Sequence, residues 1–391
     1  MPDNPHVALI VETATVYGRR ILQGVTRYLH AHRPWSVFLE QHDLNAAPPR
    51  WLRTWRGDGV ISRMPSRFLA TALRRRGLPA VDLSDRQRPV GVPRINSDDE
   101  AVGRLAAEHL RDRGLKSLAF CGFVGELWSA RRRAGFRAAA AEWGLSCPTF
   151  ATKWAGPNVP PWESEQEAIR RWLRGLRHPV GVMACNDMRG QHVLDACQRA
   201  GLRVPDEVTV IGVDDDEVLC ELCTPPLSSV VPNAERVGYE AAALLDRLMA
   251  GGKAERAETF VEPLRVAARQ SSDVLAIDDA AITAAVRFVR ENACRGIGVE
   301  DVLRAVPVSR TFLERQFRHY LGRSPHAEIR AAQLARVRHL LADTDLKLSQ
   351  VAERTGFTHP EYLSVVFRGA TGQSPGQYRR VIRLGRHAGP R

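Results

Sequence analysis

Long apolar runs are absent from this chain of 391 residues. No stretch approaches the roughly 18 to 20 consecutive apolar residues that are needed to cross a bilayer. The apolar residues 7–11 form too short a run for the hydrophobic part of a signal peptide, and the residues before them carry no positive side chain. We therefore expect a cytoplasmic protein that has no membrane partner.

Cysteine is also scarce, with seven residues in the whole chain. Their spacing shows no paired metal-binding pattern, and their number is odd. Cys220 and Cys223 form a lone C-x-x-C motif, which leaves open a redox role or half of a zinc site. Two ordinary reduced thiols are the favoured interpretation. The sequence therefore predicts no metal and no other cofactor.

Motifs of common catalytic sites are missing as well. The chain contains no G-x-S-x-G elbow, no phosphate-binding P-loop and no H-E-x-x-H motif. Each of these motifs places a nucleophile, a phosphate cradle or a metal at a fixed spacing, so their absence argues against the corresponding enzyme classes. We expect a protein that is not an enzyme and has no catalytic residues.

Lysine is rare, with four residues, yet abundant arginine gives the chain a net charge of +12. The excess is concentrated, because residues 277–391 contain 19 Lys and Arg against 11 Asp and Glu, whereas the other 276 residues contain 37 against 33. A GC-rich genome explains the preference for arginine over lysine, but it does not explain this concentration. A basic terminal domain is the electrostatic footprint of a nucleic-acid-binding protein, and the expected partner is double-stranded DNA.

Residues 6–268 alternate short apolar runs with helix-like patterns, which predicts βαβ units and parallel sheets. A second series of units begins near Ile95, where Ser97 and Glu100 form a capping-box pattern with Ser97 as the helix cap. Residues 226–231 are expected to return the chain to the first lobe. The fold class is thus a two-lobed α/β domain with two parallel sheets flanked by helices. Ligands of such sheets bind at the carboxyl ends of the strands, so a cleft is expected there.

The remaining residues have only helical patterns. We expect a linker over residues 269–279, with the polar stretch 270–273 as its clearest part, and an all-α domain over residues 280–385. Two segments, at about 298–319 and 348–369, have the pattern helix, short turn, helix. Ser309 is expected to cap the second helix of the first segment, and Thr358 with Glu361 that of the second. This is a double helix-turn-helix, in which each second helix enters the major groove.

Residues 348–379 read L-S-Q-V-A-x-x-x-G-F-x-x-x-x-Y-L-x-x-x-F-R-x-x-x-G-x-S-P-x-x-Y-R, which resembles the signature of the AraC family of transcription regulators. The resemblance implies that early residues of each second helix read bases. These residues are Arg310, Thr311, Glu314 and Arg315 in the first segment, and Pro360, Glu361, Ser364 and Val365 in the second. Arg315 can pair with guanine, and Glu314 can accept from cytosine. The residues expected at phosphates are Arg318, Arg368 and Arg379.

Two positions depart from this family pattern. Pro307 stands in the first turn, where a residue with positive φ is common, and proline cannot adopt that conformation. Val365 stands where a polar residue is frequent. The second recognition helix is therefore expected to read DNA weakly or through a thymine methyl group.

A second resemblance covers the α/β part. Its motifs are Ile95-Asn-Ser-Asp-Asp, Arg132-x-x-Gly-Phe, Ala-Cys-Asn186-Asp187 and Val-Ile-Gly-Val-Asp214-Asp, which are similar to the sugar-binding core of LacI/GalR-type repressors. That core has the two-lobed fold of periplasmic binding proteins, and the resemblance implies a neutral sugar in the cleft. The residues expected to bind it are Tyr17, Trp128, Arg132, Asn186, Asp187 and Asp214. A structural role stays open for three of them, because Asp187 could cap the next helix and Tyr17 and Trp128 could be packing residues.

The order of the two parts differs from that of LacI-type repressors, whose helix-turn-helix precedes the sugar-binding core. The order found here is similar to that of regulators of bacterial xylose operons. This resemblance implies D-xylose or a related pentose as the small sugar effector, a homodimer, and activation of sugar-catabolic genes, in which RNA polymerase would be a further partner. The alternatives are a different sugar or polyol, repression in place of activation, and, remotely, an AraC-type DNA-repair enzyme, although no Cys-Pro-Cys-His cluster is present.

Overall fold

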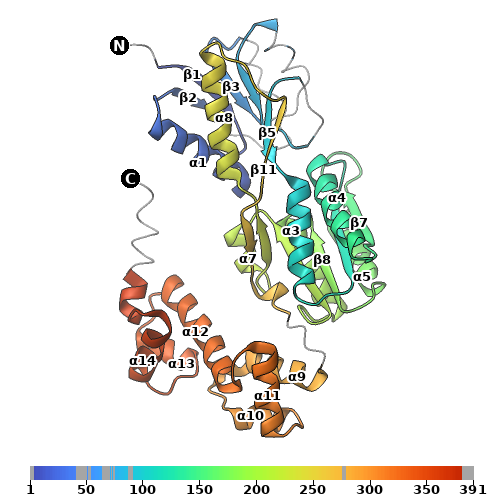
Figure 1. Ribbon diagram of the computed structural model, residues 1–391, viewed down its shortest axis with the longest axis vertical. Helices are drawn as coiled ribbons and strands as arrows, with labels where there is room; N and C mark the ends of the chain where they lie inside the picture. Colours follow the sequence, from blue (N-terminus) through green and yellow to red (C-terminus); the bar gives the residue numbers. More distant parts are fainter. Residues whose placement is uncertain are drawn as a thin grey trace. The chain divides into compact units, whose positions relative to one another are not determined.

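The computed structural model describes residues 4–40, 51, 54–63, 71, 73, 75–86, 91–274 and 279–380. The chain forms two compact units, Met1–Val274 and Leu275–Arg391 (Figure 1). The predicted boundaries of the sugar-binding core, the linker and the helical domain are finer than this division and stay predictions. No helix among the described residues is long and apolar enough to span a bilayer.

The first lobe of the first unit contains a six-stranded sheet with the order β11-β5-β4-β3-β1-β2, in which all described pairs are parallel. Its strands are β1 (His6–Ile10), β2 (Ser36–Leu39), β3 (Gly59–Ser62), β4 (Ala80–Asp82), β5 (Arg94–Ser97) and β11 (Glu258–Val261). Helices α1 (Val16–Ala31) and α8 (Ala234–Met249) pack against it through Ile21, Val25 and Leu245. Because helices cover the sheet, β3 and β4 are buried along their whole length.

The second lobe contains a six-stranded sheet with the order β12-β10-β9-β8-β6-β7, parallel except for the pair β10–β12. Its strands are β6 (Leu118–Val124), β7 (Thr149–Lys153), β8 (Val180–Ala184), β9 (Val208–Val213), β10 (Ser228–Val231) and β12 (Arg265–Ala267). Its helices are α3 (Asp99–Arg111), α4 (Leu127–Glu142), α5 (Trp162–Arg174), α6 (Asp187–Ala200) and α7 (Glu217–Leu222). The predicted fold class, two mainly parallel sheets flanked by helices, is confirmed.

The chain passes between the lobes at residues 97–99, 231–234 and 261–265. The prediction that the second lobe starts near Ile95 is therefore wrong by one strand, because β5 joins the first sheet before the chain crosses. Residues 228–231 likewise form the strand β10 of the second sheet, and the return to the first lobe follows it. An apolar strand looks the same in sequence whichever of two parallel sheets it joins.

The cap of α3 also differs from its prediction. Asp98, and not Ser97, is the cap, and its carboxylate accepts from the backbone nitrogens of Glu100 and Ala101 at 3.1 and 2.9 Å. Ser97 ends β5, and its hydroxyl is 2.8 Å from the hydroxyl of Tyr17. Two adjacent residues with capping side chains stand here, and only the crossing of the chain decides which one caps the helix.

The end of the first unit is tightly held. Residues Gln270–Ser272 form a short 3-10 helix in which Ser271 and Ser272 are fully buried. The hydroxyl of Ser271 donates to the carbonyl of Val210 at 2.7 Å and accepts from the nitrogen of Ser228 at 2.8 Å. The chain therefore leaves this unit from a fixed point on the second lobe.

The second unit is helical over its described residues. Its helices are α9 (Ala280–Asn292), α10 (Val299–Ala305), α11 (Arg310–Leu321), α12 (Pro325–Asp343), α13 (Leu348–Arg354) and α14 (Pro360–Thr371). The pairs α10–α11 and α13–α14 each pack on their own apolar cluster, the first around Leu313 and Phe317 and the second around Leu363 and Phe367. Helix α12 joins them, and its buried Gln333 donates to the carbonyl of Ala293 at 3.0 Å and to that of Gly356 at 3.4 Å.

The two helix-turn-helix turns have different backbones. In the first, Val306 is extended with φ of −134°, which suits the following Pro307. In the second, Gly356 has φ of +73°. Ser309 caps α11 as predicted and accepts from the nitrogen of Phe312 at 3.2 Å. The predicted cap at Thr358 is wrong, because α14 begins after His359, which makes no side-chain cap.

Candidate functional site

A cavity of about 440 Å³ lies between the two lobes of the first unit. Its lining comes from residues that follow β1, β3 and β4 of the first sheet and β6, β7, β8 and β9 of the second. These are the carboxyl ends of parallel strands, where ligands bind in open α/β sheets. All six residues predicted to bind the ligand line this cavity, namely Tyr17, Trp128, Arg132, Asn186, Asp187 and Asp214.

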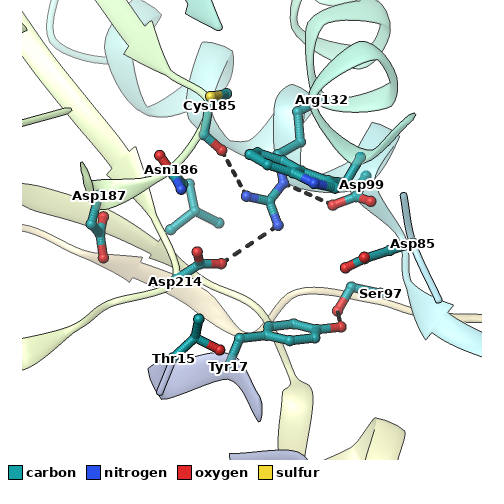
Figure 2. A network of polar contacts seen from close by, with 12 residues as sticks. Thr15, Tyr17, Asp85, Ser97, Asp99, Arg132, Cys185, Asn186, Asp187 and Asp214 are labelled. Carbon is teal, nitrogen blue, oxygen red and sulfur yellow. Dashed lines mark hydrogen bonds and ion pairs between the residues drawn. The ribbon is translucent and has the colours of Figure 1, made fainter. Parts of the chain in front are cut away.

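Arg132 is the central charged group of the cavity and is 4% exposed. Its Nε donates to Asp99 Oδ1 at 2.8 Å, its Nη1 donates to the carbonyl of Cys185 at 2.7 Å, and its Nη2 lies 3.5 Å from Asp214 Oδ1 (Figure 2). Burial raises the pKa of Asp99 to about 6, although the guanidinium beside it opposes the rise. The side chain of Arg132 is thus held by three protein partners.

Two glycines allow Arg132 to reach Asp99. Helices α3 and α4 approach so closely that a Cβ at Gly103 would lie 2.1 Å from the carbonyl oxygen of Arg132, and one at Gly135 would lie 1.9 Å from that of Glu100. Only glycine fits at such a contact. The Arg132-x-x-Gly motif therefore combines an arginine that lines the cavity with the glycine that brings its helix close to α3.

Asp214 stands at the end of β9 in a strained backbone conformation with φ of +106°, and Asp215 follows with φ of +51°. Arg20, on α1 of the first lobe, donates to the carbonyls of Asp214 and Asp215 at 2.7 and 2.9 Å. Burial raises the pKa of Asp214 above its usual value, and Arg132 opposes the rise. The contact joins the two lobes beside the cavity and holds Asp214 in its unusual conformation.

The first lobe contributes a charged group that sequence reasoning missed. Arg63, after β3, pairs with Asp85, after β4, at 2.7 Å, and it also forms an ion pair with the buried Glu12. Asp85 Oδ1 is buried without a hydrogen-bond partner among the described residues, although Asp85 lines the cavity. A buried acceptor without a partner is the kind of atom that a ligand hydroxyl satisfies. The signal was available, because each residue lies two positions after a short, mainly apolar run, at 60–61 and 80–83.

Aromatic rings supply the apolar part of the cavity. The rings of Trp128 and Trp154 are 6.2 Å apart, and the guanidinium of Arg132 lies 5.0 Å from the ring of Trp128. Tyr17 lies under the guanidinium of Arg63 at 4.6 Å, and its hydroxyl is engaged with Ser97 (Figure 2). Tyr17 and Trp128 are thus both packing residues and cavity walls. Trp154, after β7, was not predicted.

Asn186 and Asp187 line the cavity in different ways. The side-chain oxygen of Asn186 caps α6 by accepting from the nitrogen of Arg189 at 2.9 Å, which leaves its amide group able to donate. The carboxylate of Asp187 accepts from the hydroxyl of Ser229 at 2.6 Å and from the nitrogen of Asp216 at 2.8 Å. Asp187 therefore stabilises the cavity wall through these two bonds. The cap of α6, which the sequence left open as a role for Asp187, is Asn186.

The charges of the cavity nearly balance. The positively charged lining residues are Arg63, Arg86 and Arg132, and the acidic ones are Asp85, Asp187, Asp214 and Asp216. Burial and the neighbouring Asp214 raise the pKa of Asp187 well above its usual value, which favours its neutral form. A cavity with paired charges, convergent donors and acceptors and indole faces suits a small neutral ligand with many hydroxyl groups.

The predicted DNA-contacting residues of the first recognition helix lie on the outside of α11. Arg310, Thr311, Arg315 and Arg318 are exposed and Glu314 is partly exposed, whereas Leu313 and Phe317 face the core. Arg310 pairs with Glu300 at 2.6 Å, and Arg318 lies 3.8 Å from Glu314. Surface pairs of this kind cost little to break, so they leave these side chains available to DNA.

On α14 the predicted residues are less uniform. Glu361, Val365 and Arg368 are exposed, with Val365 exposed to 70%, and the hydroxyl of Ser364 donates to the carbonyl of Pro360 at 3.0 Å. Arg379 lies beyond this helix and donates to the carbonyls of Leu341 and Leu346 at 3.4 and 2.7 Å. The contact of Arg379 with a DNA phosphate stays a prediction. Its guanidinium already forms hydrogen bonds at the end of α12.

The two cysteines of the C-x-x-C motif are free and buried. Burial raises the pKa of Cys223 to about 11, with the charge of Asp187 adding to the rise. Among the described residues, no group of three or more His, Cys, Asp and Glu is arranged to hold a metal ion. Both thiols pack in the core of the second lobe.

Three protein-family models match successive parts of the chain. The XylR N-terminal domain matches residues 6–91, the periplasmic binding protein-like domain matches residues 107–272, and the helix-turn-helix domain matches residues 302–381. Together they cover both lobes and both helix-turn-helix segments.

Similar proteins extend over nearly the whole chain. The xylose operon regulatory protein of Escherichia coli (strain K12) is 32% identical over 385 residues, which are 96% of this chain and 97% of the relative. That of Haemophilus influenzae is 27% identical over 381 residues, which are 95% and 97%. A solved structure of a xylose-binding transcription activator is 30% identical, covers 97% of this chain and 99% of its own, and has a TM-score of 0.77. A CelR–cellobiose complex, at 24% identity and a TM-score of 0.56 over 70% of this chain and 86% of its own, shares the fold.

A two-lobed α/β unit with a polar cavity, followed by two helix-turn-helix pairs with exposed second helices, defines a DNA-binding transcription regulator with a ligand-binding unit. Its relatives are regulators of this class and not enzymes. The chain belongs to the family of xylose operon regulatory proteins.

Proposed function

We propose that this protein binds D-xylose in the cavity of its first unit and, as a homodimer in the cytoplasm, activates genes of xylose use. The observation that carries the proposal is the polar set of the cavity, in which Arg132 is held between Asp99 and Asp214 beside an indole face. The full-length similarity to xylose operon regulatory proteins favours D-xylose over other sugars and activation over repression.

In this proposal each cavity residue has a chemical role. Arg132 donates to sugar hydroxyls, Asp214 accepts from them and Asn186 donates through its amide group. Asp85 Oδ1 accepts a hydrogen bond from a further sugar hydroxyl, which gives this buried atom the partner that it lacks among the described residues. Trp128 covers the apolar C–H surface of the sugar ring. Asp187 keeps its structural bonds and supports the wall.

The DNA side of the proposal uses the exposed faces of α11 and α14. Arg315 and Glu314 read bases from α11, and Val365 contacts a thymine methyl from α14. The remaining proposed contacts, to bases or phosphates, are Arg310, Thr311, Arg318, Glu361, Ser364 and Arg368. A homodimer would present four recognition helices, and activation would bring RNA polymerase to the promoter.

A ligand panel tests the effector. The purified full-length protein is heated alone and with D-xylose, L-arabinose, D-ribose, D-glucose or xylitol, and binding is confirmed by calorimetry. A ligand at 100 times its dissociation constant adds about 2.7 kcal/mol to the free energy of unfolding. We expect this shift with D-xylose and its loss in Asp214→Asn, because the amide cannot accept at both of its positions.

Asp195→Asn is the matched control, since Asp195 lies on the surface of α6 and pairs with Arg199. It should bind like the wild type. A shift with another sugar alone would replace D-xylose as the effector. No shift with any sugar, from folded protein that still binds DNA, would refute the proposed use of the cavity.

A further inference from the structure

An ion pair between Arg86 and Glu126 joins the two lobes beside the cavity, and neither residue is among those assigned to the sugar. Arg86 follows β4 of the first lobe, and Glu126 follows β6 of the second lobe, just before α4. Arg86 Nε donates to Glu126 Oε2 at 2.7 Å, and Arg86 Nη2 donates to Oε1 at 2.6 Å. Two parallel bonds between a guanidinium and a carboxylate form the strongest common type of side-chain ion pair.

The surroundings of this pair connect it to both walls of the cavity. The backbone nitrogen of Leu127 donates to the carbonyl of Arg86 at 3.2 Å, so the main chains of the two lobes also meet here. The indole nitrogen of Trp128 donates to Glu126 Oε2 at 3.1 Å, and the guanidinium of Arg86 lies 5.5 Å from the ring of Trp154. The pair therefore fixes both indoles as well as the distance between the lobes.

The burial of the pair shows what separation would cost. The side chain of Arg86 is 16% exposed, and that of Glu126 is 7% exposed. When the lobes part, these two largely desolvated charges lose the two bonds that join them. Because a desolvated, hydrogen-bonded charge pair must break before the partners separate, such a pair slows dissociation and has much less effect on association.

We propose that the Arg86–Glu126 pair is a clasp that keeps the lobes closed over the bound sugar and sets how long the sugar stays. The proposal rests on the proposed function of the cavity. Arg86 lines the cavity, but Glu126 is not among the lining residues. The clasp therefore acts by positioning the lobes and not by forming the main contacts with the ligand. It is distinct from the Arg20 contact, in which the guanidinium donates to two backbone carbonyls and forms a longer ion pair, of 3.6 Å, with the carboxylate of Asp215.

Dissociation kinetics of D-xylose from the full-length protein test the clasp. The fluorescence of Trp128 and Trp154 in the cavity wall provides the signal for stopped-flow mixing, and calorimetry gives the affinity. We expect Arg86→Gln and Glu126→Gln each to raise the dissociation rate about tenfold or more, with little change in the association rate. Glutamine at position 126 can still accept from the indole of Trp128, so the wall keeps its shape.

A double-mutant cycle separates a clasp from a direct contact. The combined variant should dissociate no faster than either single one, because each substitution already breaks the pair. Arg86→Lys should behave like Arg86→Gln, since an ammonium keeps the charge but cannot form the two-bond fork. A faster rate in the Arg86 variants alone, with Glu126→Gln like the wild type, would overturn the clasp and make Arg86 a ligand contact.

The pair Arg104–Glu142 provides the matched control. It is also bidentate, at 2.9 and 2.5 Å, but it joins two helices within the second lobe and is exposed. Arg104→Gln and Glu142→Gln should leave both rates unchanged. If calorimetry shows no binding of D-xylose to the wild type, the proposed effector is wrong, and the proposal of a clasp over D-xylose is wrong as well. If the wild type binds and every clasp variant matches it, only the clasp is wrong.

Discussion

Arg132 illustrates at the scale of single residues how this protein keeps charge inside a cavity. A buried guanidinium is stable only when acceptors surround it, and here Asp99, Asp214 and the carbonyl of Cys185 do so. Arg63 follows the same rule with Glu12 and Asp85. Because protein groups hold both guanidinium groups, their orientation in the cavity wall does not depend on the ligand alone.

His109 is a partly buried titratable residue outside the cavity, and it permits a prediction of pH dependence. Its Nδ1 is 3.0 Å from Arg113 Nη1, and its Nε2 is 2.8 Å from the hydroxyl of Ser272. Arginine only donates, so Nδ1 accepts and Nε2 carries the proton that is donated to Ser272. Burial, with the charge of Arg113 in addition, lowers the pKa of His109 to about 4.

The sign of the effect follows from this lowered pKa. Between about pH 6.5 and pH 4 the unfolded chain binds a proton at His109 that the folded chain does not bind, so the free energy of unfolding falls as the pH falls. At pH 5 the loss from this residue is up to about 2 kcal/mol. Urea unfolding at pH 7.5 and pH 5 should show a smaller pH-dependent loss in His109→Gln than in the wild type. The exposed variant His30→Gln is the control, and an equal loss in all three proteins would contradict the prediction.

At the scale of elements, the two candidate sites lie at the carboxyl ends of the strands and on the exposed sides of two helices. Parallel strands bring their carboxyl ends to one edge of each sheet, so residues distant in sequence line one cavity. In the second unit, the helices α11 and α14 bury one side and expose the other. The exposed sides are chemically unlike, because α11 carries Arg315 and Arg318 while α14 carries the apolar Val365.

This difference leads to a prediction for α11. Arg315→Ala should weaken binding to the operator by about 1 to 3 kcal/mol and relax the base preference at one position. Arg318→Ala should weaken binding to all sequences alike and reduce the slope of affinity against salt by about one. Fluorescence anisotropy with an operator selected by the wild type, and with a scrambled duplex, at several salt concentrations measures both effects. Equal losses on the two duplexes in Arg315→Ala would show that Arg315 contacts phosphate and not a base.

At the scale of the whole molecule, the point where the chain leaves the first unit matters most. Ser271 and Ser272 are fixed to the second lobe by bonds to Val210, Ser228 and His109. A movement of that lobe against the first is therefore passed to the start of the segment that leads to the second unit. Ligand binding that favours one arrangement of the lobes can act on DNA binding by this route.

Such coupling must be reciprocal. If D-xylose changes the affinity for the operator by some factor, the operator changes the affinity for D-xylose by the same factor, which is typically about 5- to 150-fold. Operator titrations with and without saturating D-xylose, and calorimetry of D-xylose with and without operator, measure the two factors. We expect them to agree, and we expect both to approach one in Asp214→Asn under conditions where this variant no longer binds the sugar. A factor of one in the wild type would mean that the sugar does not regulate DNA binding.

The sequence by itself determined the α/β alternation and the double helix-turn-helix, because strand periods, helix periods and turn residues are local properties of the chain. It indicated six residues of the cavity through their resemblance to the motifs of a known family. It did not decide that β5 and β10 belong to the sheets that they join, which of Ser97 and Asp98 caps α3, or that Asp187 braces a wall. Those outcomes depend on where the chain crosses between the lobes. Arg63, Asp85 and Trp154 line the cavity, and Arg86 pairs with Glu126, because the carboxyl ends of strands from two separate sheets surround one cavity. Contacts of this kind between distant segments are set by packing and not by the residues next to them.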